Sequence, residues 1–289
     1  MDVAAAMLLS LLALLAGTGH ARSAGVGEAI VEIERLTWME IRDRIAAGHR
    51  TVIVPTGGTE QNGPHMVTGK HNFIVAETAR RIARALGDAL VAPVLAYVPE
   101  GDPAVRAGHM TYPGTISLPE PAFAQVLQAV ALSHKTHGFE TIVLLGDSGG
   151  NQAVQAEVAS RLNAAWRGTG TRVVNAAAYY ADNGGDAYLA GLGYSAAAIG
   201  THAGLRDTSE LIAVDPNAVR ADLLGPGGNG ASGDARAASA EIGRRLLELK
   251  VEAAIAEIRR ARSAPIEERA EPVGGETGLI ARLKRLILG

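Results

Sequence analysis

Short apolar runs alternate along the chain with longer segments in which apolar residues recur at helical spacing. The short runs predict buried strands, and the longer segments predict helices with one face against a core. The predicted strands are residues 51–54, 89–98, 141–145 and 172–177. The predicted helices are residues 36–48, 72–86, 119–136, 152–166 and, the longest, 234–262. This repeated order is the pattern of an α/β domain whose mainly parallel sheet is covered by helices on both faces.

Capping and breaking residues mark the ends of these elements. Thr37 is placed to cap the first helix, Gly87 to end the second, and Pro93 lies inside or at the edge of the predicted strand 89–98. No internal repeat and no clear linker interrupts the pattern. We therefore predict one domain over residues 22–264, followed by a tail, residues 265–289, that ends in a short amphipathic helix over 279–288.

The N-terminus carries one long apolar run, VAAAMLLSLLALLA, over residues 3–16. It is shorter than the roughly 20 residues that span a bilayer and has the length of a signal-peptide hydrophobic region. Gly19 and Ala21 provide small residues before a cut after Ala21, although no basic residue precedes the run. We expect residues 1–21 to be a signal peptide and the mature protein to be periplasmic or secreted, without a stable membrane anchor. A buried N-terminal helix is the alternative.

Composition narrows the chemistry. The 27 basic and 30 acidic side chains give a net charge of -3 without long blocks of either sign, so we expect no nucleic-acid partner. The sequence has no cysteine, so any metal ion must be held by His, Asp, Glu or neutral oxygen atoms.

Polar residues follow the predicted strands, where ligands bind in sheets of this kind. Glu60, His65 and His71 come soon after strand 51–54. Carboxylate oxygen and imidazole nitrogen hold Zn²⁺, Mn²⁺ or Fe²⁺ when thiols are absent. A polar loop whose side chains cap helix ends and satisfy backbone groups is the alternative interpretation.

Asp147 and Ser148 follow strand 141–145 in the sequence GDSGGN. The glycines allow a sharp turn, from which either side chain would project into the crevice at the strand ends. Gly146 and Gly150 flank Ser148 as in the nucleophile elbow of serine hydrolases. A Ser148 nucleophile with His202 as its base is therefore one alternative. Taken by themselves, His202 and Asp207 are interpreted as a helix cap or a core hydrogen bond, and His109 in its glycine-rich loop has the same ambiguity.

Taken in order, these segments resemble the creatininase (creatinine amidohydrolase) family from about residue 36 to residue 247. The motifs that carry the resemblance are PTGGTEQNGPH at 55–65, His109 with YPGTISL at 112–118, GDSGGN at 146–151, HAG and DTS within 202–209, and GD at 233–234. The resemblance implies a three-layer α/β/α domain, commonly a homo-oligomer. It also implies a metal-dependent amidohydrolase that acts on a non-peptide C–N bond of a small, often cyclic, amide.

The family pattern implies a two-metal site made by a Glu-x-His pair, a later Asp, a His in a glycine-rich turn and a further Glu. Here the first Glu is kept as Glu60, but Asn62, His71, Ser148 and Asp207 stand at the other four positions. A bridging carboxylate can bind two cations, whereas one imidazole nitrogen binds one. We therefore predict one divalent ion per chain, Zn, Mn or Fe, on Glu60, His71 and Asp207, with Asn62 and Ser148 as weak oxygen donors.

The resemblance also implies a catalytic histidine at His202, which we predict to move the proton. We expect His65, His109 and Asp147 at the substrate pocket. Because Asn62 and Ser148 depart from the family pattern, an exported binding protein that keeps the pocket without catalysis is the alternative from another class.

Overall fold

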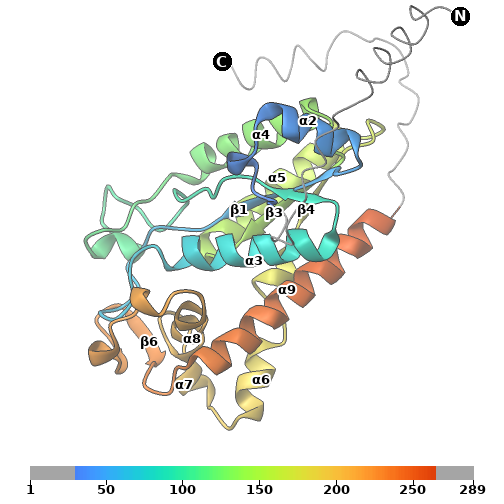
Figure 1. Cartoon of the computed structure of the whole chain (residues 1–289). Coiled ribbons are helices and arrows are strands. Elements are labelled where there is room, and N and C mark those ends of the chain that lie inside the picture. Colours follow the sequence, from blue (N-terminus) through green and yellow to red (C-terminus); the bar gives the residue numbers. More distant parts are fainter. Residues whose placement is uncertain (1–29, 265–289) are drawn as a thin grey trace, which may run out of the picture.

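The computed structural model describes residues 30–264 (Figure 1). The predicted signal peptide 1–21 and the predicted tail 265–289 with its amphipathic helix lie outside the described residues. Among the described residues, no helix is both long and apolar enough to cross a membrane.

The centre of the fold is a four-stranded parallel sheet with the order β2-β1-β3-β4. The strands are β1 (Thr51–Thr56), β2 (Ala89–Val91), β3 (Thr141–Gly146) and β4 (Arg172–Asn175). β1 and β3 pair along their whole length and every residue of both is buried, which explains their almost continuous apolar sequence.

Helices cover both faces of this sheet (Figure 1). On one face lie α2 (Trp38–Ala46), α4 (Glu120–Thr136) and α5 (Gln152–Ala165), and on the other lie α3 (Lys70–Leu86) and α9 (Ala240–Ser263). Alternate strand residues enter the two cores: Val54 and Leu144 face α4 and α5, whereas Ile53 and Val143 face α3 and α9. The predicted three-layer α/β/α class is confirmed.

The region after β4 adds small elements that pack against α9, α3 and one another. These are helices α6 (Gly185–Gly191), α7 (Ala196–Ile199) and α8 (Leu205–Val214), and a hairpin of strands β5 (Pro226–Gly228) and β6 (Ala231–Asp234). Single 3₁₀ turns are η1 (Ile33–Arg35), η2 (Gly108–Thr111), η3 (Gly149–Asn151), η4 (Ala177–Tyr179), η5 (Pro216–Ala218) and η6 (Ala221–Leu223).

Several boundaries differ from the sequence predictions, and three of them have clear local reasons. β2 stops at Val91 rather than continuing to residue 98, because Pro93 has no N–H to donate to a ladder. α9 begins after Ser239, whose hydroxyl caps Ile242 N–H, so residues 231–234 are free to form β6. α3 begins at Lys70, two residues earlier than predicted, and this places Lys70 and His71 in its first turn.

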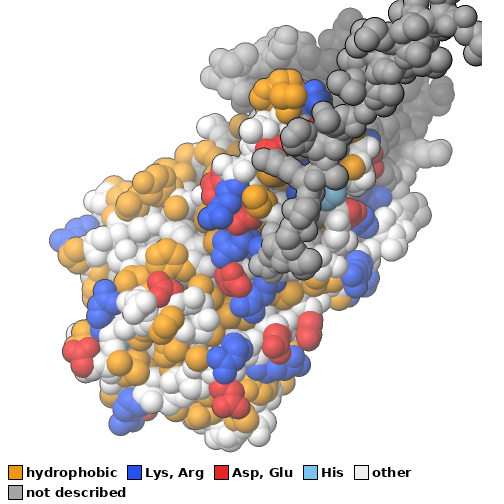
Figure 2. Space-filling model, in the orientation of Figure 1, with side chains coloured by type: hydrophobic (Ala, Val, Ile, Leu, Met, Phe, Trp, Pro, Cys, Tyr) orange, Lys and Arg blue, Asp and Glu red, His pale blue; other side chains and the backbone are white. Residues whose placement is uncertain are grey.

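Charges of both signs are mixed on the face shown in Figure 2, over the outer sides of α3 and α9. On α3, Glu77 pairs with Arg80 and Arg81 at 2.7 Å each, and on α9 Arg245 pairs with Glu248 at 3.0 Å. Exposed pairs of this kind contribute little to stability, but they keep the outer faces of these helices hydrated. The mixture agrees with the absence of charge blocks in the sequence.

We predict that Gly243 sets the close contact between α9 and α8. A Cβ at Gly243 would overlap the backbone oxygen of Ser209, whereas a Cβ at the helical Gly191 meets nothing within 4 Å. Gly243→Ala should therefore lower the free energy of unfolding by about 1–3 kcal/mol. Gly191→Ala is the matched control and should leave it unchanged or raise it by up to about 1 kcal/mol. Urea denaturation measures both, and equal stabilities of the two variants would contradict the prediction.

Candidate active site

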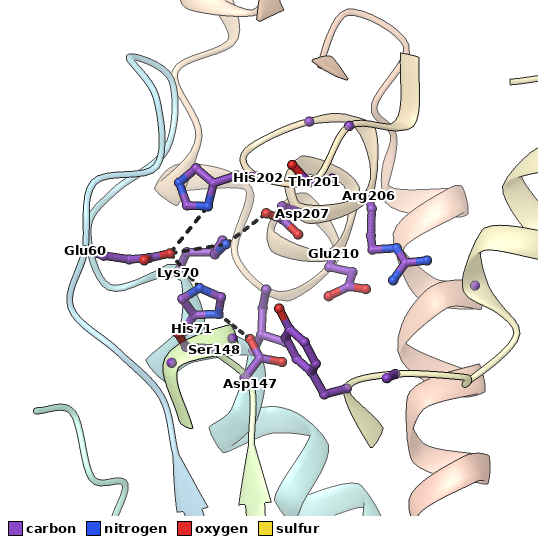
Figure 3. Close-up of a pocket in the computed structure, with 18 of the residues that line it drawn as sticks. Glu60, Lys70, His71, Asp147, Ser148, Thr201, His202, Arg206, Asp207 and Glu210 are labelled. Carbon is purple, nitrogen blue, oxygen red and sulfur yellow. Dashed lines mark hydrogen bonds and ion pairs between the residues drawn. The ribbon is translucent and has the colours of Figure 1, made fainter. Parts of the chain in front are cut away.

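Loops at the carboxyl ends of the strands surround a cavity of about 1040 Å³ (Figure 3). The loop after β1, the start of α3, the loop after β3 and the region before α8 all contribute to its wall. The cavity wall includes a group of ionisable residues close to the ends of β1 and β3: Glu60, Lys70, His71, Glu100, His109, Asp147, His202 and Asp207.

The carboxylate of Glu60 is the centre of this group. It is 2% exposed, and its Oε1 lies 2.8 Å from His71 Nε2 and 3.9 Å from Lys70 Nζ. Its Oε2 lies 3.1 Å from His109 Nε2. Burial by itself raises the pKa of Glu60, but the hydrogen bond with His71 and the charges of His71 and Lys70 outweigh burial and hold this pKa well below its usual range. Glu60 is therefore a buried carboxylate ion.

His71 bridges two buried carboxylates. Its Nε2 lies 2.8 Å from Glu60 and its Nδ1 lies 2.8 Å from Asp147 Oδ2. Burial and the charge of Lys70 lower the pKa of His71, but the hydrogen bonds to the two carboxylates raise it to about 9. Both ring nitrogens therefore carry a hydrogen at neutral pH, and the ring is a cation.

A second set of buried charges continues from Asp147. Lys250 on α9 places Nζ 2.6 Å from Asp147 Oδ1 and 2.9 Å from Glu210 Oε2. Tyr179 donates its hydroxyl hydrogen to the same Asp147 oxygen at 2.8 Å. Burial raises the pKa of Asp147, but the Lys250 charge and the hydrogen bond with His71 lower it further than burial raises it. Anions and cations thus alternate from the sheet edge to α9.

The buried Lys70 and the half-buried Asp207 form a further ion pair, visible in Figure 3. Lys70 Nζ lies 2.9 Å from Asp207 Oδ2, and the same oxygen accepts from the Ala203 N–H at 2.8 Å. Burial raises the pKa of Asp207, but the Lys70 charge lowers it below its usual range. Asp207 is the third residue of α8, so this ion pair joins α8 to the start of α3.

Glu100 adds a carboxyl group that the sequence did not single out. Ser148 donates its hydroxyl hydrogen to Glu100 Oε2 at 3.2 Å, and a Cβ at Gly58 would overlap Glu100 Oε1. Burial and the nearby charge of Glu60 raise the pKa of Glu100 to about 8. Among the described residues Ser148 has no hydrogen bond to His202, so the alternative of a Ser148 nucleophile lacks the contact between nucleophile and base.

His202 turns a free nitrogen toward Glu60. Its Nε2 donates to the backbone oxygen of Gln61 at 2.9 Å, so Nδ1 carries no hydrogen in the neutral ring. This Nδ1 lies 3.6 Å from Glu60 Oε1. Burial and the Lys70 charge lower the pKa of His202 to about 4, so the ring is neutral at neutral pH. The unprotonated His202 Nδ1 and the carboxylate oxygen Glu60 Oε1, both electron-pair donors, therefore face each other.

His109 is held in the other tautomer. Gln61 Oε1 accepts from Gly63 N–H at 2.9 Å, so its Nε2 donates and lies 2.9 Å from His109 Nδ1. His109 Nε2 therefore carries the hydrogen and donates it to Glu60 Oε2. A metal ion at this Nε2 would displace the hydrogen to Nδ1 and would require the Gln61 amide to turn.

The residues present fit one divalent metal ion at Glu60, His109 and His202. Their ligand atoms all lie within 4.8 Å of one another. A cation between His202 Nδ1 and Glu60 Oε1 would satisfy both electron-pair donors, and a change of tautomer at His109 would supply the third ligand. Of the five metal ligands predicted from the sequence, Glu60 belongs to this triad.

The structure gives the other four predicted ligands protein partners. His71 uses both ring nitrogens, and Asp207 accepts from an ammonium and a backbone N–H. Asn62 Nδ2 donates to the backbone oxygen of Glu60 at 2.9 Å, whereas its Oδ1 has no hydrogen-bond partner among the described residues. The Ser148 hydroxyl donates to a carboxyl group. As metal ligands these four residues stay predictions.

Two of the three predicted substrate residues, His109 and Asp147, line the cavity. His65 is buried outside the cavity lining, with its Nε2 2.9 Å from Thr208 Oγ1, where it joins the loop after β1 to α8. Sequence reasoning missed Lys70, Glu100 and Lys250. Lys250 could have been found, because it is the one charged residue on the otherwise apolar buried face of α9. Lys70 could not, because a lysine at the start of a helix is ordinarily exposed.

The parallel sheet and the buried carboxylate–histidine site at its carboxyl edge define an α/β/α protein with a candidate active site where such sheets bind their ligands. The family model for creatininase, described as creatinine amidohydrolase, matches residues 34–258. The chain belongs to the creatininase family, as the sequence resemblance predicted.

Similar proteins of known activity are hydrolases. The chain is 31% identical over 115 residues to creatinine amidohydrolase of Pseudomonas putida, across 40% of this chain and 44% of that protein. It is 29% identical over 120 residues to 3-dehydro-scyllo-inosose hydrolase of Thermotoga maritima, across 41% and 36% of the two chains. Each match spans less than half of the relative's length. A solved structure of a mutant creatininase, described as Zn-Zn type, has a TM-score of 0.67 at 25% identity and covers 82% of this chain and 100% of its own.

We predict that the charge on His71 makes stability depend on pH. The pKa of His71 is raised from 6.5 to about 9, so its contribution is complete below pH 6.5 and is lost as the pH rises to 9. Over that window the free energy of unfolding of the metal-free wild type should fall by up to about 3 kcal/mol more than that of His71→Gln. Urea denaturation at several pH values measures this difference, and parallel profiles would show that His71 is not the titrating group.

Proposed function

We propose that this protein is a hydrolase of a non-peptide C–N bond in a small, possibly cyclic, amide and that it uses one divalent metal ion, Zn, Mn or Fe. The observation that supports the proposal is the convergence of Glu60, His109 and His202 at the wall of the cavity. The hydrolase activities of the relatives named above support the same reaction class. Because those matches cover only part of each relative, the substrate is left at the level of its chemical class.

The metal ion, when bound at Glu60, His109 and His202, would activate a water molecule and polarise the substrate carbonyl. The surrounding protein residues hold these groups in place. His71 fixes one oxygen of Glu60, and the Gln61 backbone oxygen fixes the His202 ring. Glu100, with its raised pKa of about 8, holds a proton at the cavity wall at neutral pH and can donate it to the departing nitrogen.

His202 has two alternative roles, as proton carrier or as metal ligand. The sequence predicts that it moves the proton, whereas its free Nδ1 beside Glu60 supports a role as ligand. We propose the ligand role, because its pKa of about 4 leaves it neutral and able to bind a metal ion. The metal content of a His202 variant separates the two roles.

We predict that Glu60→Gln and His202→Ala each lower the bound metal at least tenfold, because each removes a ligand. The full chain, purified without a histidine tag, should hold about one divalent ion by elemental mass spectrometry, and both variants should lose hydrolysis of amides found in a screen. Glu140→Gln, an exposed glutamate paired with Arg50, is the matched control and should keep metal and activity. A His202→Ala protein that keeps its metal but loses hydrolysis would instead support the proton-carrier role.

The second candidate is an exported binding protein without catalysis. It is favoured by one observation: Lys70 and the protonated His71 already compensate the buried charge of Glu60 without a metal ion. This candidate predicts that small amides bind to the metal-free chain and are not cleaved. Isothermal titration with the amides of the same screen, followed by chromatography of the mixture, distinguishes it from the hydrolase.

Export and self-association are also proposed. The proposal of export rests on the apolar run over residues 3–16, and that of a homo-oligomer rests on the family resemblance. Fractionation of cells that express the full chain and light scattering of the purified protein test them.

A further inference from the structure

We propose that the ammonium group of Lys70 is a built-in cation that stands between Glu60 and Asp207 and limits this site to one divalent metal ion. The inference rests on the proposed metal-dependent function, because it concerns how many ions the same site takes.

The position of Lys70 is fixed on both sides. Its side chain is 2% exposed, and Nζ lies 2.9 Å from Asp207 Oδ2 and 3.9 Å from Glu60 Oε1. A buried ammonium without anionic partners is strongly disfavoured, so the two carboxylates hold it in place. Lys70 is also the first residue of α3, and its backbone N–H donates to the Val67 oxygen at 3.3 Å.

The same two carboxylates are the negatively charged groups that a second ion would need. Asp207 Oδ2 already accepts from Lys70 and from a backbone N–H, and Glu60 Oε1 already accepts from His71. A divalent ion between Glu60 and Asp207 would lie within a few ångströms of the ammonium, at a distance where like charges repel strongly in a buried site. Two ions can therefore be held only after the ammonium leaves.

The triad of Glu60, His109 and His202 stays available to one ion. Its imidazole nitrogens approach both oxygens of Glu60, His109 at Oε2 and His202 at Oε1, and it uses no atom of Asp207. The ammonium group of Lys70 has no free electron pair, so it is not a ligand of this triad. In contrast, the similar solved creatininase is described as a Zn-Zn type. The negative charges of Glu60 and Asp207 are therefore neutralised by one permanent ammonium group and one exchangeable metal ion.

Counting bound zinc tests the inference. The full chain is stripped with a chelator and then titrated with Zn²⁺ by equilibrium dialysis at pH 7, with zinc measured by elemental mass spectrometry. Wild type should saturate at one equivalent. Lys70→Met should take two, because it removes the ammonium and frees Glu60 and Asp207 for a second ion. Lys70→Arg keeps the charge and should stay at one.

Lys135→Met is the control for loss of a lysine outside the site, because Lys135 contacts Thr169 and Thr171 instead. It should also stay at one equivalent. Lys70→Gln replaces Lys70→Met if circular dichroism shows that the methionine variant does not fold. Two equivalents in wild type, or one equivalent in both wild type and the neutral variant, would overturn the inference.

The same experiment separates this inference from the proposed function. If wild type binds no zinc and Lys70→Met binds one equivalent, the metal-dependent function fails, whereas the blocking role of Lys70 stands. If neither protein binds zinc, both fail. Saturation of wild type at one equivalent and of Lys70→Met at two, without hydrolysis of any amide, supports the inference and contradicts the hydrolase proposal.

Discussion

The burial of the Glu60 carboxylate is the constraint on which the site depends. A carboxylate ion that is 2% exposed can persist only with close donors and cations. They come from separate parts of the chain: His71 and Lys70 from the first turn of α3, and His109 from the loop after β2. The loop after the carboxyl end of β1 and the first turn of α3 must therefore keep their relative positions for this buried charge to be tolerated.

The compensation of Glu60 extends into the packing of the helices. His71 also forms an ion pair with Asp147 after β3, and Asp147 forms a second ion pair with Lys250 on α9. Lys70 forms an ion pair with Asp207 on α8. Three helices are thus tied to the carboxyl edge of the sheet by ion pairs. Removing one partner would leave a buried charge with less compensation, which costs stability even where other partners stay.

The sequence was sufficient to predict the layers and most of the elements, because strand and helix periodicity depends on local burial. It predicted Thr37 as a cap, and the structure shows its capping box with Glu40. It failed at Pro93, whose lack of an N–H ends β2 early. The error concerns only where β2 ends, because the residues on either side of Pro93 are still apolar.

The site was less predictable, because its partners meet through the fold. His202 and Glu60 are far apart in the sequence, and neither residue reveals the other. The motif at residues 55–65 located Glu60, but spacing alone could not show that His71 uses both nitrogens on carboxylates. Lys70 was not singled out because nothing local distinguishes a buried lysine at a helix start from an exposed one.

The division between a protein cation and a metal ion has a chemical consequence. An ammonium compensates carboxylate charge and fixes its geometry, but it has no open coordination position and cannot lower the pKa of a bound water molecule as a metal ion does. Lys70 can therefore replace a metal ion in holding Glu60 and Asp207 in place, but not in activating water. In the proposed function, hydrolysis by metal-activated water would depend on the triad of Glu60, His109 and His202. The tautomer of His109, set by Gln61, would then decide how readily an ion enters.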